Sequence, residues 1–220
     1  MPNPTLSQHQ PQVQAGTRPP VVLLVQGGIA AGKSTVTRLL VAQGATHLDC
    51  DRLAHEELRD PAVEAEVREA FGGAVFGPDG HVSRPALGEV VFQDPAALAR
   101  LEALIHPRVR ERVRAALSAQ ARPQGEPRAV VVIDAAVASK MRLAERYDLV
   151  VFVSASLETR RARAATRGWA PGELERRESH QLSLAASQEA AHFVVPNDGD
   201  LQETETHVQR LWSELVQPLR

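Results

Sequence analysis

Residues 27–34 read Gly27-Gly28-Ile29-Ala30-Ala31-Gly32-Lys33-Ser34, which fits the phosphate-loop pattern G-x-x-x-x-G-K-[ST]. Five apolar residues, 21–25, precede the pattern and are typical of a buried parallel strand. Residues 35–42 follow with apolar side chains at helical spacing, and Gly44 is placed to end that helix. An ordinary glycine-rich turn would not need this context. Strand, turn and helix in this order predict a loop that binds a nucleoside triphosphate in an α/β protein.

Each residue type in the loop has a physical role in holding phosphate. Gly27 and Gly32 permit backbone angles that let successive N–H groups converge on one anion, and the helix that begins near Lys33 adds its own N–H groups. Lys33 is expected to contact the β- and γ-phosphates, and the Ser34 hydroxyl to bind Mg²⁺. The predicted nucleotide contacts are Gly28, Ile29, Ala30, Ala31, Gly32, Lys33, Ser34 and Thr35.

Length and composition limit the class of protein. The chain has 220 residues, a formal net charge of -2 and 43% hydrophobic residues, which suits one α/β core with small insertions. The near-zero charge gives no reason to expect nucleic acid as a partner. One cysteine, no signal segment and no membrane-length apolar run predict a cytoplasmic protein without a membrane partner. The sequence leaves the oligomeric state open, with a monomer as the default expectation.

Carboxylates follow two apolar segments. Asp49 and Asp51 come after the short segment 46–48, and Asp134 ends the apolar run 129–133. The carboxyl ends of parallel strands form the ligand-binding edge of such a sheet. We therefore expect Asp51 to act as the acid–base residue, with a helix N-cap as its alternative role, and Asp134 to lie near Mg²⁺.

Helical patterns dominate residues 52–127 and do not follow the strand–helix rhythm of the core. A long helix is predicted from Pro95, with an interruption at Pro107 because proline removes one helical hydrogen bond. Most arginines of this helix fit a solvated basic face. His106 and Arg110 are the two residues that we expect to bind a phosphorylated substrate.

Residues 157–190 contain two arginine-rich helices separated by a glycine- and proline-containing hinge, and we name them the lid segment. Arg160, Arg163 and Arg167 share one helix face. Phosphoryl transfer needs exclusion of water and positive charge near the γ-phosphate, and such a segment supplies both. The alternative for each arginine is a solvated face with carboxylate partners. Together these features predict a small-molecule kinase.

The ordered set of motifs resembles the dephospho-coenzyme A kinase family, within the nucleoside-monophosphate-kinase-like branch of phosphate-loop proteins. The resemblance covers about residues 21–211. Its anchors are Gln26 to Thr35, Leu48-Asp49-Cys50-Asp51 with Ala54, Leu104-Ile105-His106-Pro107, the segment from Phe152 to Arg167, Gln181, and Phe193-Val194-Val195 before Asn197-Asp198-Gly199.

The resemblance implies a three-layer phosphate-loop fold with a central parallel sheet, and MgATP-dependent phosphorylation of the 3′-hydroxyl of dephospho-coenzyme A. It also implies catalytic roles for Asp51, Lys33 and Arg163, and nucleotide contacts for Arg167 and Arg177. The expected organisation is a disordered Pro/Gln-rich tail (1–20), a nucleotide-binding core (21–51, 128–156 and 191–220), a helical acceptor domain (52–127) and a lid (157–190).

Three positions depart from the family pattern. They are Lys140, where the family usually has an acid, Ser187 in place of a basic lid residue, and His192 in place of an aspartate. They leave open a kinase for another small hydroxyl or nucleotide acceptor, or an inactive binding protein. A GTPase-like switch would need the guanine-reading pattern Asn-Lys-x-Asp, which the sequence lacks.

Overall fold

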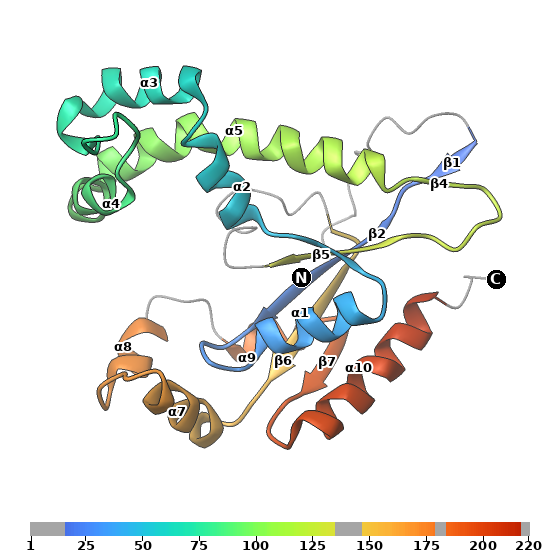
Figure 1. Ribbon diagram of the computed structural model, residues 1–220. Coiled ribbons are helices and arrows are strands. Elements are labelled where there is room, and N and C mark those ends of the chain that lie inside the picture. Colours follow the sequence, from blue (N-terminus) through green and yellow to red (C-terminus); the bar gives the residue numbers. More distant parts are fainter. Residues whose placement is uncertain (1–15, 135–146, 179–183, 217–220) are drawn as a thin grey trace. The chain divides into compact units, whose positions relative to one another are not determined.

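The computed structural model describes residues 16–134, 147–178 and 184–216 of the chain (Figure 1). The chain divides into two compact units. The first consists of residues 1–48 with 117–220, and the second of residues 49–116. None of the described helices is both long enough and apolar enough to cross a membrane.

A parallel sheet of five strands forms the centre of the first unit (Figure 1). Its order is β3–β5–β2–β6–β7, so the strand before the phosphate loop is the middle one. The strands are β2 (Val21–Gly27), β3 (Thr46–Leu48), β5 (Val130–Asp134), β6 (Leu149–Ser154) and β7 (Phe193–Pro196). All neighbouring pairs are parallel. The predicted α/β class with a central parallel sheet is confirmed.

Side chains on one face of the central strand β2 pack against two of the helices of the first unit. Val21, Leu23 and Val25 point to one face of β2 and are buried with residues of α1 (Lys33–Ala42) and α10 (Leu201–Val216). The intervening residues of β2 are buried as well. The continuous apolar run in the sequence therefore reflects a strand covered on both faces. A further helix, α9 (Leu184–Glu189), contacts β2 and β6.

The lid segment contains α7 (Leu157–Thr166) and α8 (Glu173–Glu178) in its described part. Ser156 caps α7, because its hydroxyl accepts a hydrogen bond from Thr159 N at 3.1 Å. Gly168 adopts a positive φ of 78° directly after α7. This left-handed conformation ends the helix and turns the chain toward α8.

The expected disorder of residues 1–20 does not hold for the last part of that segment. Strand β1 (Thr17–Arg18) pairs antiparallel with β4 (Arg122–Pro123). Arg128 adds hydrogen bonds of 2.9 and 3.0 Å to the main-chain oxygens of Pro19 and Pro20. Hydrogen bonds to a distant segment thus order residues that composition alone classed as a tail.

The second unit contains α2 (Cys50–Glu57), α3 (Pro61–Phe71), the 3₁₀ turn η1 (Gly73–Val75) and α4 (Arg84–Gln93). Most of α5 (Pro95–Ala119) also belongs to it. The predicted interruption of α5 is wrong, because one helix continues through Pro107. The buried stripe of Ile105, Val109 and Val113 lies on both sides of that proline, and its packing outweighs the lost hydrogen bond.

Candidate active site

The phosphate loop joins the end of β2 to the start of α1 and has the backbone geometry of an anion-binding turn. Gly27 and Gly32 have φ angles of 149° and 99°, which a side chain would make costly. Ala30 is the one non-glycine residue with a positive φ, 60°, in the described part of the chain. Such conformations persist where the surrounding structure imposes them, commonly at binding sites. No side chain caps the first turn of α1, which leaves this helix start open to an anionic ligand.

Lys33 lies across its own loop. Its Nζ atom donates hydrogen bonds of 3.1 Å to the main-chain oxygens of both Gly27 and Gly28. These carbonyls hold the ammonium group at the mouth of the loop. A phosphate bound to the loop amides would meet this charge without a large movement of the side chain.

Two side chains from distant elements brace the loop at Ala31. The Asn197 amide donates to Ala31 O at 2.6 Å, and Arg163 Nη1 donates to the same oxygen at 3.1 Å. Arg163 Nη2 also donates to Asn197 O at 2.8 Å. The Thr204 hydroxyl donates to Asn197 Oδ1, so the buried amide is satisfied at both ends. The sequence analysis did not identify Asn197 as a site residue. Its position was a usable signal, because Asn197 directly follows strand β7, just as the predicted site residue Asp134 lies at the end of strand β5.

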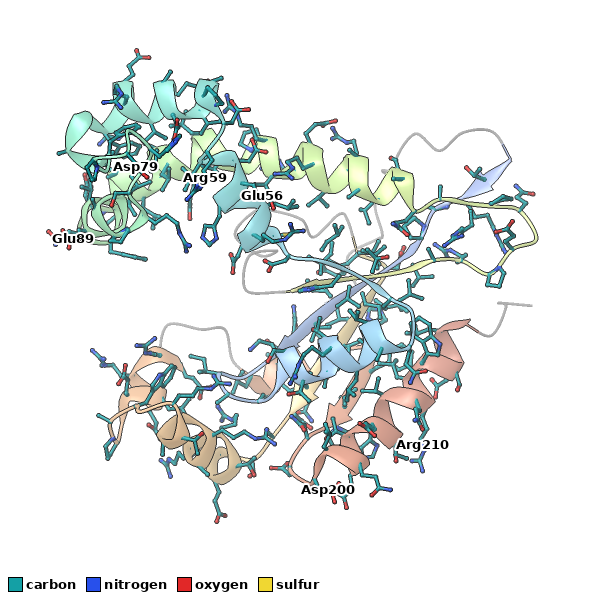
Figure 2. The ribbon with its side chains drawn as sticks, in the orientation of Figure 1. Glu56, Arg59, Asp79, Glu89, Asp200 and Arg210 are labelled. Carbon is teal, nitrogen blue, oxygen red and sulfur yellow. The ribbon has the colours of Figure 1, made fainter. Side chains whose placement is uncertain are left out.

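A pocket of about 260 Å³ opens beside the loop. Its walls come from the loop and start of α1, the end of α7, and the turn into α10. The lining residues include Ala30, Gly32, Ser34, Thr35, Arg163 and Arg167. Asp200, labelled in Figure 2, also lines the pocket and caps α10 by accepting from Glu203 N at 2.9 Å. The structure thus brings six of the predicted site residues to one pocket.

The arginines of the lid segment divide into two groups. Arg160, Arg161, Arg176 and Arg177 each form an ion pair with a glutamate of α8. Arg163 and Arg167, among the described residues, have no carboxylate within ion-pair distance. Both line the pocket, so they bring positive charge to its wall, where it would favour an anionic ligand.

Arg177 therefore differs from the other predicted nucleotide contacts. Its guanidinium binds Glu173 Oε1 at 2.6 Å and stacks on the Trp169 ring at 4.2 Å. The pKa of Glu173 is lowered, mainly by this hydrogen bond. A contact between Arg177 and nucleotide stays a prediction.

The turn after β6 is held by a carboxylate beside the pocket. Asp198 Oδ1 accepts from Ser156 N at 2.7 Å and from the Thr159 hydroxyl at 2.8 Å. These bonds, together with the nearby charge of Arg163, lower the pKa of Asp198 below its ordinary value. The carboxylate form thus fixes the start of α7, the helix that carries Arg163.

The two aspartates after β3 take different positions from those expected. The strand ends at Leu48, before both of them, and Asp49 is the N-cap of α2 with its carboxylate accepting from Arg52 N at 2.9 Å. The alternative role of Asp51 as the cap is therefore wrong. Asp51 lies in the first turn of α2 with an exposed side chain. Cys50 between them is buried.

His106 and Arg110 lie half-buried on α5 in the second unit. Three other arginines of that helix have carboxylate partners: Arg108 binds Glu66, Arg112 binds Glu56 and Glu57, and Arg114 binds Glu111. Arg100 lies over the Phe71 ring instead. Figure 2 shows Glu56 on α2, and the hydrogen bond from Arg112 is the main cause of its lowered pKa. These pairs match the solvated face expected for most of the arginines.

The remaining predicted positions differ in how far they are described. The backbone of Asp134 ends β5 beside Val25, but its side chain is outside the described part of the chain, and Lys140 and Gln181 lie outside the described residues altogether. His192 has a structural partner, because its Nδ1 accepts from Val150 N at 2.9 Å. Ser187 lies half-buried in α9.

The comparisons with known proteins agree with this geometry. A family model described as "Dephospho-CoA kinase" matches residues 21–203. The dephospho-CoA kinase of Leifsonia xyli subsp. xyli is 42% identical over 192 residues, covering 86% of this chain and 96% of that protein. The enzyme of Streptomyces avermitilis is also 42% identical, covering 86% and 91%.

Two solved structures share the fold. The crystal structure of TT1252 from Thermus thermophilus has a TM-score of 0.73 and 32% identity, covering 90% of this chain and 99% of that one. The dephospho-CoA kinase from Campylobacter jejuni has a TM-score of 0.61 and 19% identity, and the match covers 89% of this chain and 97% of that one.

Proposed function

This chain belongs to the dephospho-CoA kinase family and catalyses ATP-dependent phosphorylation of dephospho-CoA in coenzyme A biosynthesis, and we propose how its residues divide that work. The transferred group is the γ-phosphoryl of ATP, and the acceptor atom is the 3′-hydroxyl of the ribose. Such a reaction requires positioning and charge stabilisation more than covalent participation by the protein.

The phosphate loop, Arg163 and Arg167 hold the triphosphate. The loop amides and Lys33 bind the β- and γ-phosphates, while Arg163 and Arg167 face the same pocket. Arg163 is the better placed for catalysis, because its two hydrogen bonds to carbonyl oxygens fix its orientation. The observation that carries this proposal is that both arginines line the pocket of the loop and that no carboxylate of residues 16–134, 147–178 or 184–216 lies within ion-pair distance of either.

Mg²⁺ fits the donors at this site. No group of three His, Cys, Asp or Glu side chains in the described part of the chain could enclose a metal by itself. Mg²⁺ commonly keeps water and binds substrate phosphates through few protein oxygens, and Ser34 supplies a hydroxyl in the pocket. Ser34 and Asp134 are the residues that would hold it. When bound, the ion neutralises charge on the phosphates.

Asp51 accepts the proton of the attacking hydroxyl. It lies three residues beyond the end of β3, so its Cα is at most about 11 Å from that of Leu48. Strand β3 lies two positions from β2 in the sheet, which is about 10 Å, and both strands end at the same edge. Asp51 thus follows a strand that ends at the same edge of the sheet as β2. Because Asp49 takes the capping role, the Asp51 carboxylate is not required for it.

His106 and Arg110 bind the phosphorylated acceptor from α5, in the helical unit that we assign to dephospho-CoA. The assignment is tested with purified protein and MgATP, offered dephospho-CoA, nucleoside monophosphates, shikimate and gluconate in parallel. We expect turnover with dephospho-CoA alone, and phosphate at the ribose 3′ position by ³¹P NMR. Faster turnover with another acceptor would refute the acceptor assignment, while His106→Ala and Arg110→Ala should raise KM for dephospho-CoA without changing KM for ATP.

A further inference from the structure

A carboxylate of the lid segment is bound to the phosphate loop itself. Glu178 Oε1, at the end of α8, accepts a hydrogen bond of 2.9 Å from the main-chain N–H of Ile29. Loop amides of this kind bind anionic oxygens, and in the reaction those oxygens belong to ATP. The glutamate is only 15% exposed, so the contact is sheltered from solvent.

A buried arginine holds that carboxylate in place. Arg160 pairs with Glu178 Oε1, and its side chain is 9% exposed. A β-carbon built on Gly28 would lie 2.9 Å from Arg160 Nη1 and 3.1 Å from Glu178 Oε1. The Arg160–Glu178 ion pair therefore packs directly against the loop backbone. A side chain at position 28 would collide with the pair, and glycine avoids this collision.

We propose that Glu178 is a positioning residue that stands in for a phosphate oxygen in the nucleotide-free enzyme and so sets the affinity of the loop for ATP. The inference rests on the proposed nucleotide site. A triphosphate reaches the Ile29 amide only by displacing the Glu178 carboxylate. Arg160 keeps a counter-ion throughout, because the incoming phosphate takes over the pairing that Glu178 gives up.

Three variants test this exchange by calorimetric binding of a non-hydrolysable ATP analogue. Glu178→Gln removes the competing charge and is expected to bind about threefold to tenfold more tightly than the wild type. Arg160→Gln leaves Glu178 without its partner and is expected to bind more weakly. The double variant R160Q/E178Q should return toward wild-type affinity. A merely structural ion pair predicts weaker binding in both single variants.

The matched control is Glu175→Gln, which removes the same charge from the same helix. Glu175 pairs with Arg161 on the surface, at 2.6 Å, and should leave affinity unchanged. Inorganic tripolyphosphate serves as the second probe. The gain for Glu178→Gln should be the same as with the ATP analogue, because the competition concerns phosphate and not the adenosine.

Wild-type or weaker affinity of a folded Glu178→Gln protein would overturn the proposal, with folding checked by its melting temperature. If that variant does not fold, Glu178→Asp decides the question. Its carboxylate is one methylene shorter and withdraws from Ile29 N, so tighter binding supports the proposal and unchanged binding refutes it. Failure of the wild type to bind either probe would refute the proposed nucleotide site instead.

Discussion

The side-chain amide of Asn197 donates a 2.6 Å hydrogen bond to the main-chain oxygen of Ala31 and thereby ties the end of β7 to the phosphate loop. Both atoms are buried within one hydrogen-bonded group that includes the Thr204 hydroxyl. A loop that must present several amides in one orientation gains from such a fixed point, because the cost of ordering it is met before the ligand arrives.

Asn197→Ala should therefore lower both stability and nucleotide affinity. We expect a loss of about 1–3 kcal/mol in the free energy of unfolding, because the Ala31 and Thr204 groups lose a partner. KM for ATP should rise while KM for dephospho-CoA changes little. The control is Thr204→Val, which keeps the bond to Ala31 and should leave KM for ATP near the wild-type value. Denaturant unfolding and steady-state kinetics measure the two effects, and an unchanged KM in Asn197→Ala contradicts the role.

Gly32→Ala should abolish nucleotide binding, whereas Gly44→Ala should not. Both glycines have positive φ, 99° and 114°, so each substitution costs about 1–3 kcal/mol of backbone strain. At Gly32 the new methyl would also collide with the Asn197 amide, but at Gly44 the nearest atom is 3.7 Å away on Trp212. The Gly32→Ala protein should melt at the lower temperature of the two because it bears this collision as well as the strain, and it alone should lose calorimetric ATP binding. Equal binding would show that the loop tolerates the methyl group.

Lys33→Ala should lose most of the activity. We expect kcat/KM for ATP to fall by about 100-fold or more, because the ammonium group supplies charge to the phosphates in the transition state. Removal of an exposed cation elsewhere, in Arg59→Ala, serves as the control and should have no effect (Figure 2). A decrease of less than about tenfold in kcat/KM for ATP in Lys33→Ala would show that the Lys33 ammonium group does not contact the transferred phosphoryl group.

Asp51→Asn should retain ATP binding and lose phosphoryl transfer. Removal of a general base lowers kcat by about 100- to 10,000-fold, and the amide keeps the size of the side chain. Asp49→Asn is the matched control two residues away, because asparagine also caps helices and stability is preserved. Single-turnover transfer measures both. Near-normal turnover of Asp51→Asn would end its assignment as the general base.

The stability contributed by Asp198 should depend on pH. Its pKa in the folded protein is lowered by hydrogen bonds from Ser156 and Thr159, so the folded state favours the carboxylate. This contribution is complete well above pH 3.8, the ordinary value, and is lost as pH falls through the lowered pKa. Asp198→Asn should melt about 2–4 °C below the wild type at pH 7. Below about pH 3.8 the difference should shrink, and a constant difference down to pH 2 would contradict this account.

Much of the fold follows from local pattern. The apolar runs 21–25 and 129–133 predicted two of the five parallel strands to within one or two residues, because a strand buried on both faces needs a continuous apolar sequence. Pro107 is the clearest local error. A proline raises the cost of a helix, but the buried residues on both sides of it decide whether the helix continues.

The candidate site was predictable where its chemistry is carried by one short segment. The residues from Gly28 to Thr35 are given by spacing alone, since glycine conformations and a helix start are properties of neighbouring residues. For the lid arginines the helical period placed Arg160, Arg163 and Arg167 on one face, but it could not separate them. Glu178 at the end of α8 pairs with Arg160, whereas Arg163 and Arg167 have no carboxylate at ion-pair distance within the part of the chain that the structure describes.

The sequence by itself therefore determined the phosphate loop, the parallel sheet and the class of reaction, because each depends on residues that are adjacent or regularly spaced. Only the tertiary structure decided that Asn197 and Arg163 brace Ala31, and that Glu178 occupies the Ile29 amide. Those contacts join residues separated by 132 to 166 positions. Whether residues so far apart in the sequence come within hydrogen-bonding distance depends on the order of the strands and the packing of the helices. The spacing of residues along a single helix or strand does not contain that information.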